Sequence, residues 1–168
     1  MRTLKIAATF WMAAGAVCYG ASNRLEVVVF DGAGAPHSAV VKAAAEARRA
    51  FAAAGVETDW TTCEGLPNSN QACVLPPSGT YIQVRIVPEA PKSERLPLAA
   101  LGYAPGCPPT KGCFVSWVLY GRMLACAERT DQPVNVLLAY VMAHEIGHLM
   151  GMSHSPRDRK STRLNSSH

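Results

Sequence analysis

The chain has 168 residues, of which 49% are hydrophobic and 17% charged, and its formal net charge is +4. Five of the 16 basic residues lie in two terminal segments described below, residues 1–21 and 158–168. The remaining residues, 22–157, carry eleven basic and eleven acidic side chains and lack a basic patch with interleaved aromatics, so no nucleic-acid partner is indicated. We expect one domain, large enough to bury its own core, without repeats.

The N-terminal segment has the pattern of a secretory signal peptide. Two basic residues near the start precede an uncharged, mostly apolar run that ends in the small residues Gly20 and Ala21. We therefore expect residues 1–21 to be removed near Gly20 or Ala21, and the protein to be secreted, periplasmic or extracellular without stable membrane association. Two alternatives remain open, an uncleaved anchor, for which the run is short, and a lipoprotein signal ending at Cys18.

The first part of the domain reads as a strand followed by a helix. Residues 25–30 are β-branched and apolar, which predicts a largely buried strand. Ser38 is expected to cap the following helix and Gly55 to end it. The expected apolar face consists of Val40, Val41, Ala44, Ala45 and Phe51. The expected solvated face consists of Lys42, Glu46 and Arg49.

Three further strands and two helices are expected downstream. Residues 56–61 predict a second strand, and residues 80–87 a third, in which Ile82, Val84 and Ile86 alternate with polar or aromatic neighbours. The segment 96–109 is rich in proline and glycine and predicts mainly loop. Residues 114–120 predict a strand and residues 121–128 a short helix. Pro133 is expected to open a final long helix, where its missing N–H costs little.

The cysteines agree with export into an oxidising compartment. Cys63 and Cys73 bracket one short loop, and Cys107 and Cys113 bracket another, so each pair is a candidate disulfide bond. Cys126 is left over. Three alternatives stay open: its partner lies in a natural C-terminal part missing from this sequence, it is a buried free thiol, or this pairing is wrong, because sequence does not fix connectivity.

The stretch from His144 to His154 places three histidines and one glutamate at a spacing that suits zinc. On a helix, His144 and His148 lie one turn apart on one face, where two ring nitrogens reach one ion. Glu145 is rotated by about 100° from His144, which suits a carboxylate that accepts a proton from water. A glycine at position 151 can adopt a left-handed conformation and return the chain, so that His154 becomes the third ligand.

This spacing resembles the metzincin clan of zinc endopeptidases, whose signature is H-E-x-x-H-x-x-G-x-x-H. Ser155 and the apolar residues 136–143 are also similar to the matrixin branch, and the close resemblance covers about the last thirty residues before position 158. It implies an α/β (α+β) fold, a zincin-like domain with a twisted mixed sheet, one helix in the N-terminal half and an active-site helix. It also implies that residues 101–104 follow the sheet edge beside the substrate cleft, although a plain connecting loop is an equal alternative.

The chain departs from the family pattern after the third histidine. Metzincins carry a methionine in a tight turn there, and no methionine follows His154. Residues 158–168 are similar to the translation of a widely used short-read sequencing adapter over all eleven codons, and we interpret them as a non-native tail. A flexible polar C-terminus is the alternative interpretation. In either case His168 is not expected to bind the metal.

The resemblance implies a secreted, zinc-dependent endopeptidase that hydrolyses peptide bonds with a zinc-activated water. Its Zn2+ ligands are His144, His148 and His154, its general base is Glu145, and its partners are protein or peptide substrates. The alternative is a zinc-stabilised binding or structural domain without turnover, against which Glu145 argues, because zinc retention needs only the histidines. A helical protein without metal, with ordinary core histidines, is a third possibility.

Overall fold

The computed structural model describes residues 24–67, 73–105 and 114–152. The expected signal peptide, the Cys107–Cys113 pair, His154 and the tail 158–168 lie outside these ranges. The described elements in chain order are β1 (Leu25–Asp31), α1 (His37–Ala53), β2 (Thr58–Glu64), β3 (Ile82–Val87), β4 (Gly102–Tyr103), β5 (Val115–Leu119), α2 (Tyr120–Thr130) and α3 (Val134–Leu149). This arrangement is a mixed α/β fold with five strands and three helices in the described residues.

The strands form one mixed sheet in the order β2-β1-β3-β5-β4. Neighbouring strands from β2 to β5 run parallel, and α1 makes the crossover from β1 to β2. β4 pairs antiparallel with β5 and forms one edge of the sheet, with Gly102 opposite Val118. The segment 101–104 therefore follows the sheet edge, as one of the two sequence-based interpretations expected.

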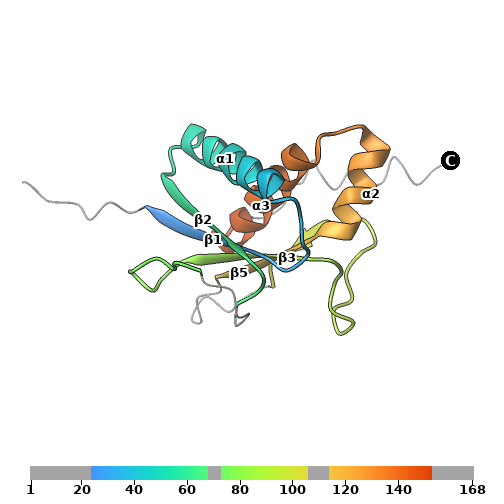
Figure 1. Ribbon diagram of the computed structural model, residues 1–168, viewed down its shortest axis with the longest axis horizontal. Coiled ribbons are helices and arrows are strands. Elements are labelled where there is room, and N and C mark those ends of the chain that lie inside the picture. Colours follow the sequence, from blue (N-terminus) through green and yellow to red (C-terminus); the bar gives the residue numbers. More distant parts are fainter. Residues whose placement is uncertain (1–23, 68–72, 106–113, 153–168) are drawn as a thin grey trace, which may run out of the picture.

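Helices α1 and α3 lie side by side on one face of the sheet (Figure 1). The core between these layers contains alternate strand residues and the inward faces of the helices. Its fully buried members include Val27, Val29, Val84, Ile86, Val118, Leu138, Met142 and Ile146. β1 is buried on both faces, which explains its continuous run of apolar residues. The sequence predicted such a largely buried strand.

The other face of the sheet carries a smaller apolar cluster and a row of aromatic side chains. Val28, Phe30 and Cys63 are buried there, and Cys73 and Tyr81 pack against them. The predicted disulfide bond between Cys63 and Cys73 is present. Farther along the same face, the rings of Tyr103 and Trp117 stack with centroids 4.9 Å apart, and the Arg85 guanidinium lies over Trp117. The stack attaches the short strand β4 to its neighbour.

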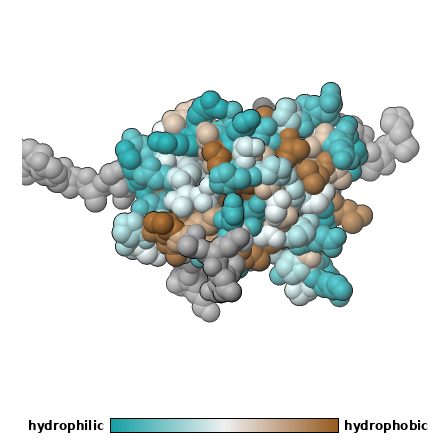
Figure 2. All heavy atoms as spheres, viewed as in Figure 1, coloured by the Kyte–Doolittle hydropathy of each residue, from teal (hydrophilic) through white to brown (hydrophobic). Residues whose placement is uncertain are grey.

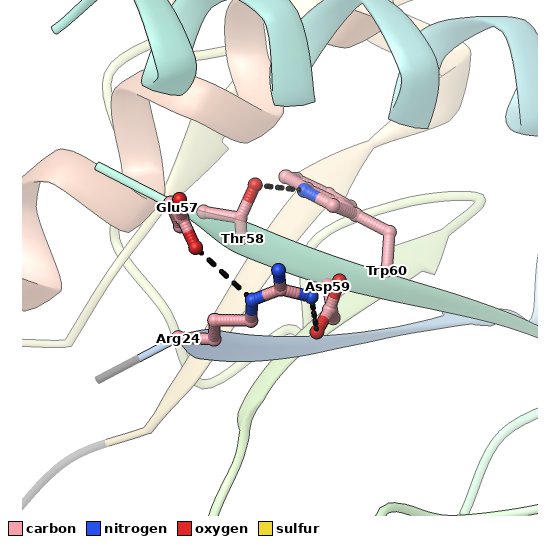
Figure 3. Close-up of polar contacts among 5 residues, drawn as sticks. All are labelled: Arg24, Glu57, Thr58, Asp59 and Trp60. Atoms are coloured by element: carbon pink, nitrogen blue, oxygen red, sulfur yellow. Dashed lines mark hydrogen bonds and ion pairs between the residues drawn. The ribbon is translucent and has the colours of Figure 1, made fainter. Parts of the chain in front are cut away.

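The start of β1 is held to β2 by exposed ion pairs (Figure 3). Arg24 Nε lies 3.0 Å from a carboxylate oxygen of Glu57, and a second guanidinium nitrogen lies 3.4 Å from Asp59. On the adjacent residues the Trp60 indole N–H donates to the hydroxyl of Thr58 at 2.8 Å. Exposed pairs of this kind stabilise only weakly, so they add little to the stability of the fold.

The predicted first helix forms, but its start and its buried face differ from expectation. Ser38 does not cap it, because the helix begins at His37 and Pro36 occupies the capping position, with its carbonyl accepting from Ala39 and Val40. Val41 is 43% exposed and Ala45 is also exposed. The buried face is formed by Val40, Ala43, Ala44, Ala47 and Phe51. The alanine-rich sequence does not determine which face of the helix is buried, since small apolar residues occupy either face at little cost.

The later elements match the predictions with shifted ends. β2 covers residues 58–64 instead of 56–61, because the Val56 amide bonds to the carbonyl of Phe51 and still belongs to the turn after α1. α2 extends to Thr130, and α3 follows Pro133 as expected.

No helix among the described residues is long and apolar enough to cross a membrane. Hydrophilic side chains cover most of the face drawn in Figure 2, with hydrophobic ones between them in small groups.

Candidate metal centre

Helix α3 carries the first two histidines of the motif and the glutamate. Leu138, Met142 and Ile146 recur at helical spacing and are fully buried, which fixes the rotation of α3 against the sheet. The same rotation places His144 and His148 on a face that is exposed to half-buried. Packing of the core therefore orients the motif.

The two helix histidines face each other across one turn. Their Nε2 atoms lie 3.0 Å apart, and the rings meet nearly at right angles, at 88°. Two ligands of a tetrahedral zinc, with bonds of about 2.0–2.1 Å, are separated by roughly 3.3 Å. The observed separation is close to this value, so a zinc ion fits between the two nitrogens after a small side-chain adjustment.

A hydrogen bond across the end of the helix orients His148. α3 ends at Leu149, and the chain turns at Gly151 with φ +89°. The Gly151 amide bonds to the carbonyl of His148, and the Met152 amide bonds to the carbonyl of Gly147. This turn places the Met152 carbonyl 2.8 Å from Nδ1 of His148. Because a carbonyl only accepts, Nδ1 carries the proton, and Nε2 of the neutral ring presents its lone pair toward His144.

Glu145 is buried beside the histidines. The residue is only 6% exposed. The backbone of Ala104, in the edge segment, approaches its carboxylate. Burial raises the pKa of the Glu145 carboxyl above its ordinary value, while the nearby His148 and the Ala104 hydrogen bond partly lower it. A carboxyl with a raised pKa holds a proton more readily, which suits a general base.

These side chains line a hollow of about 360 Å³ between α3 and the segment that leads into β4. Residues 99–102 form one wall, and Tyr140, Val141, His144, Glu145 and His148 form the other. The hollow lies at the sheet edge, where β4 has a neighbour only in β5 among the described strands.

The third predicted ligand, His154, lies outside the described residues. Within residues 24–67, 73–105 and 114–152, no group of three or more His, Cys, Asp or Glu side chains is close enough to hold a metal ion. The described part thus contributes two imidazole nitrogens at a separation that suits zinc. Cys126 is a free, half-buried cysteine on α2 and is not grouped with them.

Three features of the site were not anticipated from sequence. The ring of Tyr140 stacks on His144 with centroids 6.3 Å apart, and the i,i+4 spacing on α3 would have indicated this contact. Arg122 of α2 donates to the carbonyls of Pro97 at 2.8 Å and Ala100 at 3.2 Å, which holds the wall of the hollow. Gly102 contacts Glu145 directly. The last two contacts join residues that are distant in sequence, so no local sequence pattern predicts them.

Comparison with known proteins adds no relative. No protein-family model matches the chain, and neither the curated proteins nor the solved structures contain a significant match. The functional assignment therefore depends on the motif and on the geometry of its described residues.

Proposed function

We propose that the chain is a secreted zinc-dependent endopeptidase of the metzincin type, with a zincin-like catalytic domain. One observation carries the proposal: the Nε2 atoms of His144 and His148 lie 3.0 Å apart beside the buried carboxylate of Glu145, in a hollow at the sheet edge. The Gly151 turn supports it, because the chain reverses where His154 needs to approach.

In the proposed reaction, His144, His148 and His154 would hold Zn2+. The ion, when bound, would supply a Lewis acid for activating water and polarising the scissile carbonyl. Glu145 accepts the proton of the attacking water and delivers it to the leaving amine, and its buried place beside the histidines suits this role. The peptide substrate adds to the outer side of β4 as a further strand, which aligns its carbonyl with the site.

The experiment compares wild type with Glu145→Gln for zinc content and for hydrolysis of unstructured peptides. Glutamine preserves size and removes the base, so we expect zinc to stay and hydrolysis to fall by about 10²–10⁴-fold. Glu128→Gln, an exposed position on α2, is the matched control and should change neither quantity. Equal, measurable hydrolysis by Glu145→Gln and wild type would refute Glu145 as the base. Zinc binding by wild type without hydrolysis would leave the zinc-stabilised binding domain as the better assignment.

A further inference from the structure

The backbone of the edge strand lies in contact with the Glu145 side chain because residue 102 is glycine. A Cβ atom added at Gly102 would lie 2.9 Å from both Cγ and Oε1 of Glu145 and 2.7 Å from the carbonyl oxygen of Trp117. Cβ atoms do not tolerate such separations, so any other residue would displace the carboxylate or the strand. Gly102 thus forms one side of the space that Glu145 occupies.

The same segment approaches the carboxylate at a second position. Ala104 lies two residues beyond Gly102, and its backbone is near enough to Glu145 to lower the pKa of the carboxyl. Tyr103, between them, points to the opposite face of the sheet and stacks on Trp117. The Leu119 amide also bonds to the carbonyl of Leu101 at 2.8 Å. The segment that contacts Glu145 is therefore itself fixed to β5.

We propose that Gly102 is a positioning residue for Glu145: its missing side chain lets β4 pack against the carboxylate and restrict it to one orientation beside the histidines. The catalytic consequence rests on the proposed function. The contact between Gly102 and Glu145 does not depend on that function, because it is a packing contact within the folded chain. A test on folding can therefore be separated from a test on hydrolysis.

The folding test is a double-mutant cycle on the metal-free protein with Gly102→Ala and Glu145→Ala. Removing the Glu145 carboxylate vacates the space into which the new methyl group points. In the wild-type background, Gly102→Ala should lower Tm by about 5 °C or abolish folding, and in the Glu145→Ala background the loss should be clearly smaller. Gly121→Ala is the matched control, since its Cβ would lie 2.9 Å from the carbonyl of Pro88, away from Glu145, and its effect should be the same in both backgrounds.

Equal losses from Gly102→Ala in both backgrounds, including failure to fold in both, would overturn the proposal and assign the glycine to the Trp117 carbonyl contact. The second readout is kinetic. We expect Gly102→Ala to retain zinc and KM while kcat falls by about 10²-fold, the scale of a misplaced catalytic group. Unchanged kcat would also overturn the proposal. A smaller stability loss from Gly102→Ala in the Glu145→Ala background, together with no hydrolysis by wild type, would support the Gly102–Glu145 contact. It would refute only the endopeptidase assignment.

Discussion

Nδ1 of His148 lies 2.8 Å from the carbonyl oxygen of Met152, across the turn that ends α3. This single hydrogen bond joins a candidate zinc ligand to the first residues beyond its own helix. It also determines which ring nitrogen faces His144. The conformation of the turn is therefore part of the candidate metal centre.

Gly151→Ala tests the turn. A Cβ there meets nothing within 4 Å, but φ of +89° is unfavourable for alanine, so we expect a loss of about 1–2 kcal/mol in unfolding free energy. We also expect weaker zinc binding, because the turn orients His148. Gly34→Ala is the control, since that position has φ +69° and equal space away from the site. Equal zinc affinities in the two variants, measured by competition with a chelator, would contradict the link between turn and metal.

Loss of His148 should remove the metal. His148→Ala eliminates one of the two facing nitrogens, so we expect metal analysis to give far less than one zinc per chain, together with lower thermal stability in the presence of zinc. His37→Ala, an exposed histidine at the start of α1, should keep full zinc content. Retention of zinc by the His148 variant would exclude the proposed ligand set.

Arg122 should influence substrate binding more than chemistry. Its guanidinium bonds to the Pro97 and Ala100 carbonyls and holds the wall of the hollow. We expect Arg122→Met to raise KM for peptides by roughly 2- to 10-fold, the scale of one or two lost hydrogen bonds, with kcat nearly unchanged. Arg129→Met, on the exposed side of α2, is the control. A fall in kcat at constant KM would assign Arg122 a different role.

The disulfide bond should stabilise the fold without being needed for the metal. Cys63 and Cys73 are ten residues apart, and opening a loop of this size costs about 3 kcal/mol in the chain-entropy description. The paired replacement Cys63→Ala with Cys73→Ala should lower the denaturant midpoint accordingly and leave zinc content intact. Cys126→Ala should have a much smaller effect. An unchanged midpoint in the double variant would show that the bond contributes nothing in solution.

The buried carboxyl of Glu145 gives a pH dependence of stability. Its pKa is raised in the folded chain, so folding favours the protonated form, and the associated stability is lost as pH rises through that pKa. In metal-free protein at neutral pH, Glu145→Gln should therefore be more stable than wild type. The difference should shrink as pH falls below the ordinary pKa of a glutamate. Denaturant midpoints measured across pH would check this, and a variant less stable than wild type at neutral pH would contradict it.

Sequence patterns predicted the elements well where alternation or helical spacing was strong. Ile82, Val84 and Ile86 are buried as expected, and Gly151 has the left-handed conformation. The pattern is weak in the alanine-rich helix α1, where it wrongly predicts that Val41 is buried. The packing of α1 on the sheet, more than local propensity, determines which of its residues are buried.

The candidate site was predictable only within α3. His144, Glu145 and His148 share one helix, so their relative placement follows from 3.6 residues per turn. The contacts of Glu145 with Gly102 and Ala104 depend on which strand forms the sheet edge. The family resemblance implied that residues 101–104 follow this edge, but no local pattern near position 102 predicts the contacts themselves.

The shortness of β4 also bears on self-association. A free sheet edge can recruit a second copy of the chain and start aggregation, and proteins limit this with short edge strands and proline. Among the described strands, the edge strand β4 has only two residues, and Pro105 follows closely. A strand this short forms too few backbone hydrogen bonds to bind a second chain firmly. A peptide bound along β4 would need additional anchoring in the hollow beside α3, so the short strand itself limits edge-to-edge assembly.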